Sequence, residues 1–453
     1  MKAYVIGLGR SGIAAARLLK QQGWEVAISD RGTSDSLKAQ QSSLAQEAIT
    51  VQLGETPTLE TLKTVDLVIV SPGVPWDIPV LVRAREHNIP MYGEIELAWR
   101  RLNDIPWVGI TGTNGKTTTT ALCSALFQGA GFNAPACGNI GKAACKLGLQ
   151  DTTFDWIIAE ISSYQIESSQ KLAPEIGIWT TFSPDHLERH YTLENYFNIK
   201  KSLLDRAKLK ILNADEPDLR ELAKENWSQL YWASSKGAQG LIGDPSRGIY
   251  VDGEEIIAFG EKILKVSEFP MVGEHNLQNL LLAVGAARLA GVDKSAITDS
   301  MINFSGVPHR LESVCHLNGV PFINDSKATN YEAAWVGLSS VPAPAILIAG
   351  GQAKDGNDQD WFQLIKQKTS AVLLIGEATP QFAQRLEEMD YHAYSLVETM
   401  ESAVAEAVAK VQQQQGTVVL LSPACASFDQ YDNFEQRGDH FRNLCLSYVK
   451  GWQ

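Results

Sequence analysis

The stretch 107–120, which reads WVGITGTNGKTTTT, constrains the fold of this chain more than any other. Its first four residues predict a short buried strand, the segment Gly112-Thr113-Asn114-Gly115 cannot continue that strand, and an apolar pattern of helical period follows. A strand, a glycine loop and a helix that begins with Lys-Thr are typical of a phosphate-binding loop, because the loop N–H groups and the helix N-terminus face the anion. Lys116 would reach the outer phosphates, and the Thr117 hydroxyl would ligate Mg²⁺. The alternative is a glycine-rich turn with a helix-capping threonine, and the agreement of the lysine, the threonine and the flanking elements favours phosphate binding.

A second glycine motif, Gly-Leu-Gly-Arg-Ser-Gly at 7–12, lies near the N-terminus. It follows a strand-like run at 3–6 and opens a helical pattern, and a second strand-like run at 26–29 is followed by Asp30. This is the dinucleotide fingerprint in a βαβ setting, with an acidic residue near the expected offset. The motif predicts either NAD or FAD binding or a nucleotide-like domain that holds another diphosphate, and the glycines alone do not distinguish these.

Polar residues also follow three predicted strands. Ser71 opens a Ser-Pro-Gly turn, Glu160 ends a strand downstream of the phosphate loop, and His186 lies in a polar loop after a further strand. Ligands of open α/β sheets bind at the carboxyl ends of the strands. A carboxylate there suits a Mg²⁺ ligand or a general base, and a histidine suits a second ligand. The alternatives are a surface glutamate and a structural histidine.

Two pairs of polar residues lie on predicted helices. Asn276 and Asn279 are one turn apart at the start of an apolar helical pattern, where they would bind a ligand or cap the helix. Lys200 and Lys201 lie in a helical stretch that begins near Tyr196, and the alternative to a functional role is a solvent-exposed face.

The last third of the chain repeats the strand–loop–helix order. Strand-like runs at 321–324, 345–348, 372–375 and 418–421 each precede a polar or glycine-containing loop. This alternation predicts an α/β layer with a mostly parallel sheet, whose loops gather at one edge. We therefore expect an α/β protein of three domains, which comprise residues 1–103, 104–304 and 305–453.

Composition excludes several classes of protein. The net charge of the 453 residues is −13, which argues against a nucleic-acid or anionic-membrane surface. The six cysteines lack metal-type spacing and are expected to be thiols in a reducing compartment. The chain opens with MKAYVIGLGR, which lacks a secretory pattern, and holds no apolar run of membrane-spanning length. We expect a cytoplasmic monomer that does not insert into a membrane.

The combination of motifs points to a ligase. A dehydrogenase needs no Gly-Lys-Thr loop, and a simple ATPase needs no glycine fingerprint in front of it. The two motifs together suggest an ATP-driven reaction on a substrate that carries its own nucleotide. The third domain would present a second reactant. In such a reaction ATP activates one group and a nucleophile then captures it.

Ten motifs spread along the chain resemble those of the Mur ligases, in family order: GTNGKTTTT, GNIG, AEISSYQIE, SPDHLERH, YFNIK, HNLQN, VPHRLE, NDSKATN, GGQAKD and SPACASFDQYDNFEQRG. The resemblance covers essentially the whole length. It implies a Rossmann-like first domain that binds UDP, a central P-loop ATPase-type domain, and a Rossmann-like C-terminal domain that binds an amino acid. The implied reaction is the ATP-dependent addition of D-glutamate to UDP-N-acetylmuramoyl-L-alanine through an acyl phosphate, in cytoplasmic peptidoglycan precursor synthesis. On this basis the NAD interpretation of the glycine motif at 7–12 is set aside.

The same resemblance implies the site residues. The catalytic residues would be Lys116, Glu160, His186 and Lys200. One Mg²⁺ would be held by Thr117 and Glu160, and a second by His186 and a carbamylated Lys200. ATP would be bound by Gly112, Thr113, Asn114, Gly115, Lys116, Thr117, Thr118, Asn276, Asn279, Arg310 and Asp325. The UDP-sugar would be bound by Arg10, Ser11, Ser71, Pro72, Gly73, Asn139 and Ser162. D-glutamate would be bound by Lys327, Thr329, Lys354, Ser427 and Phe434.

Four other functions remain open at this point. The chain could be another Mur ligase, or a folylpolyglutamate synthetase, which would be expected to lack a first domain of the GLGRSG type. From a different class, it could be an NAD-dependent oxidoreductase with an incidental Lys-Thr loop. It could also be a nucleotide-binding regulatory protein without turnover.

Overall fold

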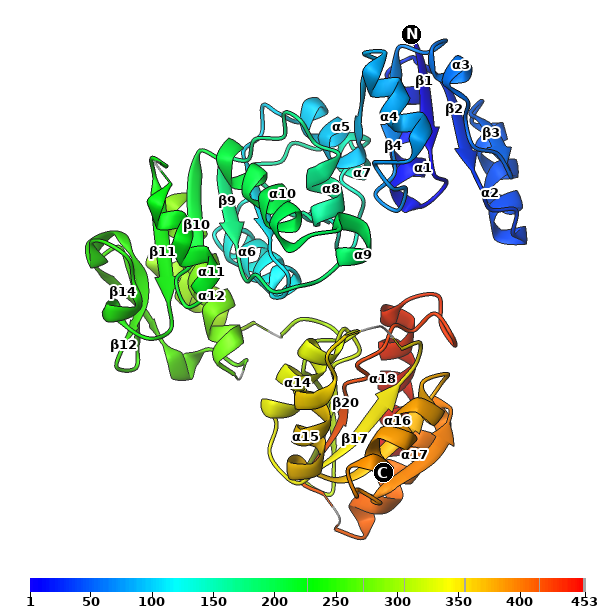
Figure 1. The fold of residues 1–453 in the computed structure, drawn as a ribbon. Helices are drawn as coiled ribbons and strands as arrows, with labels where there is room; N and C mark the ends of the chain where they lie inside the picture. Colours follow the sequence, from blue (N-terminus) through cyan, green and yellow to red (C-terminus); the bar gives the residue numbers. More distant parts are fainter. Residues whose placement is uncertain (226, 272, 305, 354–355, 415, 451–453) are drawn as a thin grey trace. The chain divides into compact units, whose positions relative to one another are not determined.

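The computed structural model describes the chain except for residues 226, 272, 305, 354–355, 415 and 451–453. It divides into two compact units, Met1–Phe304 and Ser305–Gln453. In the described residues the first unit contains a five-stranded and a nine-stranded sheet, and the second unit a six-stranded sheet (Figure 1).

The five-stranded sheet is parallel throughout, with the order β3-β2-β1-β4-β5. Along β1, Ala3 and Val5 face one apolar core while Tyr4 and Ile6 face the other, as the period of two along a strand requires. Strand order reverses between β1 and β4, so the loops that follow these two strands flank the switch point where such sheets bind ligands. The strands are β1 (Lys2–Ile6), β2 (Glu25–Asp30), β3 (Thr50–Leu53), β4 (Leu67–Val70) and β5 (Met91–Gly93), and the helices are α1 (Arg10–Gln21), α2 (Asp35–Gln46), α3 (Leu59–Leu62), α4 (Pro79–Glu86) and α5 (Glu94–Arg101).

The glycine motif at 7–12 shapes the turn between β1 and α1. Gly7 has φ +98°, a conformation that side chains with a Cβ rarely adopt. A Cβ on Gly12 would overlap the carbonyl oxygen of Gly7, so the close approach of helix to strand requires glycine there. The third glycine of the fingerprint therefore serves helix–strand packing.

The nine-stranded sheet has the order β14-β13-β12-β11-β10-β9-β6-β8-β7. Strands β6 to β12 pair in parallel with their neighbours in this group, whereas β13 and β14 continue the sheet in antiparallel pairing. The sequence analysis did not predict β12 to β14, three short strands that end with β14 at the edge of the sheet. The strands are β6 (Trp107–Thr111), β7 (Ala136–Gly138), β8 (Ile157–Glu160), β9 (Ile176–Trp179), β10 (Leu209–Asn213), β11 (Leu230–Ser234), β12 (Ile249–Asp252), β13 (Glu255–Ala258) and β14 (Glu261–Lys265).

Strand β6 is buried along its whole length and pairs with β8 and β9. The helices around this sheet are α6 (Lys116–Gly129), α7 (Cys145–Gly148), α8 (Ser163–Glu167), α9 (Leu187–His190), α10 (Leu193–Arg206), α11 (Pro217–Arg220), α12 (Glu274–Leu289) and α13 (Lys294–Ile302). Helix α12 begins at Glu274, two residues before Asn276. Its N-cap is Gly273, so neither Asn276 nor Asn279 is the capping residue.

The second unit is an α/β layer with the sheet order β15-β16-β20-β17-β18-β19. Only the β15–β16 pair is antiparallel among its described strands. On β17, Leu347 packs with α14 to α16, whereas Ile348 packs with α17 and α18, so helices cover both faces (Figure 1). The strands are β15 (Glu312–Leu317), β16 (Val320–Asn324), β17 (Ala345–Gly350), β18 (Thr369–Ile375), β19 (Tyr394–Glu398) and β20 (Val418–Leu421), and the helices are α14 (Tyr331–Ser339), α15 (Gln359–Lys368), α16 (Thr379–Glu388), α17 (Met400–Gln412) and α18 (Phe434–Lys450).

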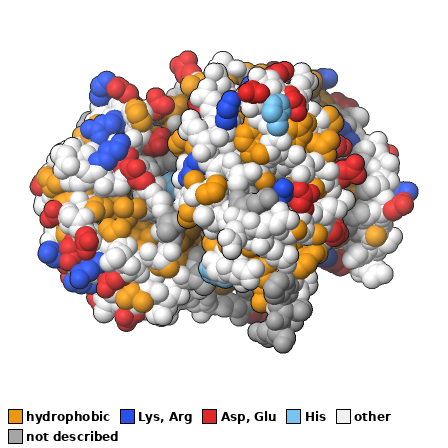
Figure 2. Space-filling view, turned by 90° about the horizontal axis from the view of Figure 1, so that it is seen from below, with side chains coloured by type: hydrophobic (Ala, Val, Ile, Leu, Met, Phe, Trp, Pro, Cys, Tyr) orange, Lys and Arg blue, Asp and Glu red, His pale blue; other side chains and the backbone are white. Residues whose placement is uncertain are grey.

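On the face shown in Figure 2, acidic and basic side chains are interspersed with apolar ones rather than gathered by sign. Among the described helices, none combines the length and the hydropathy that crossing a membrane requires. The six cysteines are free thiols, five of them buried.

Candidate functional site

The phosphate loop lies between β6 and α6, as the sequence predicts. Gly115 is the N-cap of α6, with φ +78°. A Cβ on Gly115 would overlap the side chain of Asn279, and one on Gly112 would overlap that of Thr180. Both positions therefore require glycine, because neighbouring elements press directly on the loop.

Residues after β9 hold this loop in place. The backbone N–H of Asn114 donates to Thr181 Oγ1 at 2.8 Å, and the hydroxyl of Thr180 donates to the carbonyl of Asn114. Thr113 Oγ1 both donates to the carbonyl and accepts from the N–H of Ser183, each at 3.1 Å. The sequence analysis gave 180–181 no role, although a polar run after a parallel strand was the signal that could have found them.

Two lysines converge on one carbonyl of the loop. Lys116 Nζ donates to the carbonyl oxygens of Gly112 at 2.9 Å and Thr113 at 2.6 Å, and Lys200 Nζ donates to Gly112 O at 2.7 Å. Lys200 is 1% exposed. Burial, and after it the charge of Lys116, lowers the pKa of Lys200 well below its ordinary value of 10.5. Burial therefore favours the uncharged amine of Lys200.

Lys201 lies in a different environment. It forms ion pairs with Asp205 at 2.9 Å and Glu225 at 3.4 Å and remains partly exposed. The solvent-exposed face considered for this lysine pair is thus wrong for Lys200, which is buried, whereas Lys201 is partly exposed.

Glu160 is buried at the end of β8 and is not a surface glutamate. Its Oε1 accepts a hydrogen bond from Asn139 Nδ2 at 2.7 Å, and its buried Oε2 accepts none within the described chain. A buried carboxylate oxygen without a donor fits a bound cation. Over the same residues, no three His, Cys, Asp or Glu side chains gather as a metal cluster. A cation here would need hydroxyl, phosphate or water ligands as well, which is typical of Mg²⁺.

His186 is the N-cap residue of α9, with φ +55°. Its Nδ1 lies 3.0 Å from the hydroxyl of Tyr164, and its Nε2 lies 3.5 Å from Asp185. Burial raises the pKa of Tyr164 to about 12, so this hydroxyl keeps its proton.

Asn276 and Asn279 are both buried in the first two turns of α12. Asn279 Oδ1 accepts a hydrogen bond from Thr119 Oγ1 at 3.2 Å, which ties α12 to α6 beside the loop.

A cavity of about 490 Å³ opens at the switch point of the five-stranded sheet. Six of the seven residues that the resemblance assigned to a UDP-sugar line it: Arg10, Ser11, Ser71, Pro72, Gly73 and Asn139. The seventh, Ser162, does not line it; its side chain forms a capping box with Gln165, and Gln165 lines the cavity instead.

Asp30 also lines the cavity, but its carboxylate is directed at the backbone. Its two oxygens accept from the N–H groups of Leu8 at 2.7 Å and Gly32 at 2.8 Å. The acidic residue of the fingerprint therefore holds the glycine loop.

In the second unit, the residues expected to bind the amino acid lie on two loops and the start of α18. Lys327 Nζ lies 3.9 Å from the ring centroid of Phe434, a cation–π contact, while Ser427 is buried and Thr329 half-buried. Lys354 lies outside the described residues.

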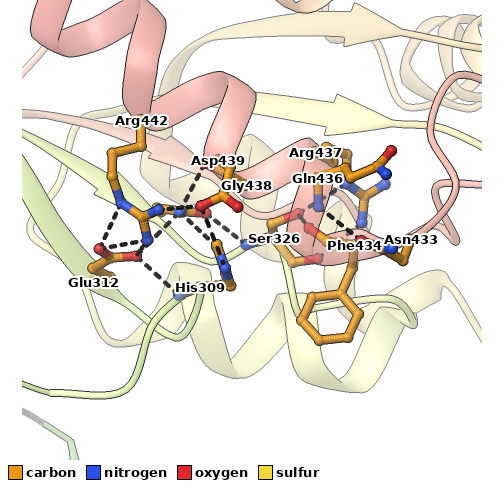
Figure 3. A network of polar contacts seen from close by, with 11 residues as sticks. His309, Glu312, Ser326, Asn433, Phe434, Gln436, Arg437, Gly438, Asp439 and Arg442 are labelled. Atoms are coloured by element: carbon orange, nitrogen blue, oxygen red, sulfur yellow. Dashed lines mark hydrogen bonds and ion pairs between the residues drawn. The ribbon is translucent and has the colours of Figure 1, made fainter. Parts of the chain in front are cut away.

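Arg437, which the sequence analysis missed, fixes these loops together (Figure 3). Its buried guanidinium donates to the carbonyl oxygens of Ser326 at 2.9 Å, Cys425 at 3.0 Å and Ala426 at 3.2 Å. Burial lowers the pKa of Arg437 to about 10, so the charge persists at pH 7. The NFEQRG motif that contains it was the available signal.

A second polar group in Figure 3 anchors β15 to α18. Arg442 binds Glu312 through both carboxylate oxygens, at 2.7 and 2.8 Å, and Glu312 accepts from the backbone N–H of His309 at 2.9 Å. Asn324 donates to the carbonyl of Gly438 at 3.1 Å. Arg310 and Asp325 lie next to this anchor in the chain.

Models of three known domain families match most of the chain. The Mur ligase MurD-like N-terminal domain matches residues 1–93, the Mur ligase middle domain matches 110–287, and the Mur ligase glutamate ligase domain matches 309–425. A protein of Gloeothece citriformis named UDP-N-acetylmuramoylalanine–D-glutamate ligase is 62% identical over 98% of this chain and 99% of its own length. The chain belongs to the Mur ligase family.

Proteins of the same name from Microcystis aeruginosa and Synechocystis are 60% and 57% identical to this Mur ligase. They cover 98% and 99% of its length, and 99% and 100% of their own.

Solved structures show the same fold. The UDP-N-acetylmuramate–alanine ligase of Thermotoga maritima matches with a TM-score of 0.60 at 16% identity, over 99% of this chain and all of that one. A pseudomurein peptide ligase type C of Methanothermus fervidus matches with 0.58 at 19% identity, over 99% of both chains. The prediction of an α/β protein with three domains and mostly parallel sheets is confirmed.

Asp325 gives a pH-dependent prediction for this ligase. Burial raises the pKa of its carboxyl from an ordinary value near 3.8 to about 7, although the Ser422 hydroxyl at 2.8 Å and Arg310 favour ionisation. Between these pH values the folded protein holds a proton that the unfolded chain has lost, so raising the pH lowers the contribution of Asp325 to stability.

We expect one carboxyl resonance of the ¹³C-aspartate-labelled protein to titrate near pH 7 and to vanish in Asp325→Asn. As a control, Asp299→Asn should leave that resonance in place. Titration of every aspartate resonance below pH 5 would contradict the assignment.

Proposed function

We propose that this Mur ligase joins D-glutamate to UDP-N-acetylmuramoyl-L-alanine, converting ATP to ADP and phosphate, in peptidoglycan precursor synthesis. The observation that carries the proposal is the 57–62% identity, over at least 98% of the chain, to proteins named for that reaction. The site agrees with it, because a phosphate loop and a separate cavity of about 490 Å³ occur in the same unit.

The substrates divide among domains bounded at 1–103, 104–304 and 305–453. ATP phosphates bind over the loop 112–118, and the UDP-sugar occupies the 490 Å³ cavity, with Asn139 and Ser162 toward its acyl end. Asn276, Asn279, Arg310 and Asp325 serve the adenosine side of ATP. D-glutamate is received by Lys327, Thr329, Lys354, Ser427 and Phe434, whose cations pair with its two carboxylates.

The reaction runs in two steps. The alanyl carboxylate attacks the γ-phosphorus of ATP and forms an acyl phosphate as ADP leaves. The amine of D-glutamate then attacks the acyl carbon, loses a proton, and the tetrahedral adduct expels phosphate to leave an amide. Lys116 moves from the loop carbonyls to the phosphates and neutralises charge there, while the glycine loop orients them.

Two Mg²⁺ ions belong to the proposed reaction, and the unpartnered oxygen of buried Glu160 supports one of them. Thr117 and the unpartnered oxygen of Glu160 would hold one, and His186 and Lys200 the other. Bound Mg²⁺ supplies Lewis-acid stabilisation of the phosphoryl charge. An ammonium at Lys200 would repel the ion. The uncharged form of this amine, which its lowered pKa favours, can attack CO₂, release a proton and become a carbamate, an anionic oxygen ligand.

The protein works on small molecules as a cytoplasmic monomer, without nucleic acid and without membrane insertion. The mixed surface charge in Figure 2 agrees with such partners.

A panel of amino acids tests the reaction. Phosphate release from ATP and UDP-N-acetylmuramoyl-L-alanine should need D-glutamate and should be at background with L-glutamate, L-alanine or glycine. Omitting the UDP-sugar is the control. Turnover with L-glutamate and not D-glutamate would overturn the acceptor, and tight NADH binding in a fluorescence titration would favour an oxidoreductase.

The carbamate has its own test. Lys200→Ala should lower kcat by about 100- to 1,000-fold, because one preorganised charge is lost, and formate or acetate should restore part of it. Lys201→Ala is the matched control and should stay near normal. Unchanged activity in Lys200→Ala, or loss of activity that no short carboxylate restores, would remove the carbamate from the account.

A further inference from the structure

The short helix α9 carries functional contacts at both ends. His186 is its N-cap, and Arg189 and Tyr191 lie at its C-terminal end. Arg189 Nη2 donates to the carbonyl oxygen of Val74 at 3.3 Å, and the Tyr191 hydroxyl donates to Asp77. Both of these partners belong to the loop that follows β4, in the first domain.

That loop forms a wall of the 490 Å³ cavity. Val74 and Pro75 line the cavity together with the Ser71-Pro72-Gly73 turn. The N–H of Val74 donates to the carbonyl of Ser71 at 2.9 Å, so the contact with Arg189 is attached directly to the turn. A ligand that binds against the turn would therefore contact the same short segment whose carbonyl Arg189 binds.

Arg189 is also fixed on its other side. Its side chain is 11% exposed and forms an ion pair with Glu167 at 2.7 Å. Its guanidinium carbon lies 5.1 Å from the ring centroid of Tyr164. The hydroxyl of Tyr164 lies 3.0 Å from His186 Nδ1, and the two rings are 5.0 Å apart. A continuous series of contacts therefore links the cavity wall to His186 through Arg189 and Tyr164.

We propose that Arg189 is a positioning residue that couples occupation of the UDP-sugar cavity to the placement of His186, so that the UDP-sugar and the magnesium nucleotide bind more tightly together than apart. The inference rests on the proposed function, because it takes its two ligands from it. It adds a residue to which no substrate contact is assigned. Coupling of this kind typically changes affinity by about 5- to 150-fold.

The test is a binding cycle measured by calorimetry. The affinity of UDP-N-acetylmuramoyl-L-alanine is titrated with and without β,γ-imido ATP and Mg²⁺, and the ratio of the two constants is the coupling factor. In the unmodified protein we expect this factor to be about 10 or more. In Arg189→Ala it should fall below about 3, while each ligand alone binds within about threefold of normal. Arg189→Lys should lie between the two.

Arg85→Ala is the matched control. Arg85 also donates to a carbonyl of this loop, that of Trp76 at 2.8 Å, and packs on an aromatic ring at 4.9 Å, but both contacts stay within the first domain. Its coupling factor should equal that of the unmodified protein. If Arg189→Ala does not fold, Arg189→Lys and Tyr191→Phe carry the test, since both retain the ion pair of residue 189 with Glu167.

An unchanged coupling factor in the Arg189 variants would overturn the inference, and so would a factor near 1 in the unmodified protein. Both results leave the proposed function standing if D-glutamate is still ligated. Failure of the unmodified protein to bind the UDP-sugar at all would instead overturn the proposed function, and this inference with it.

Discussion

The carbonyl oxygen of Gly112 accepts hydrogen bonds from two lysine side chains, and the rest of the site depends on how their charges are accommodated. Two unit charges about 4 Å apart repel by about 4 kcal/mol in a protein environment of intermediate dielectric. Burial removes the water that would screen them, and it acts most strongly on Lys200. The lowered pKa of Lys200 favours its uncharged amine, which reduces this repulsion. In the proposed function, Lys116 would then bind the polyphosphate and Lys200 would react with carbon dioxide.

Buried carboxyl groups held by specific hydrogen-bond donors also join the first two domains. Glu96 is fully buried on α5 and accepts hydrogen bonds from the backbone N–H groups of Gln170 and Lys171 in the central domain. On the same helix, Glu94 accepts from the N–H of Cys145 at 2.6 Å, and burial raises the pKa of Glu94 to about 7. Removing one partner of such a group leaves a buried polar atom unsatisfied, which is strongly destabilising. These contacts explain why residues 1–304 form one compact unit although they contain two sheets.

The parts of the site that could be predicted are those encoded by neighbouring residues. The phosphate loop and the glycine turn after β1 each fall within about ten residues, because a strand, a turn and a helix N-terminus leave a local pattern. Residues that act through distant contacts could not be found in this way. The burial of Lys200 beside partly exposed Lys201 is set by where α10 packs. Thr180 binds the carbonyl of Asn114 and Arg437 binds that of Ser326, and each partner is more than sixty residues away in sequence. Ser162 was recognised as part of a motif, but its hydroxyl is used for helix capping, and only the fold shows that Gln165 lines the cavity.

The proposed reaction depends on the glycine loop being the triphosphate-binding site. A crystal soaked with β,γ-imido ATP and Mg²⁺ tests this most directly, because the phosphorus positions report the site without turnover. The account predicts the β- and γ-phosphates over the N–H groups of residues 112–117, with Lys116 turned from the loop carbonyls to the phosphate oxygens. Density for the triphosphate in the cavity beside Ser71, or at any place away from the loop, would contradict it.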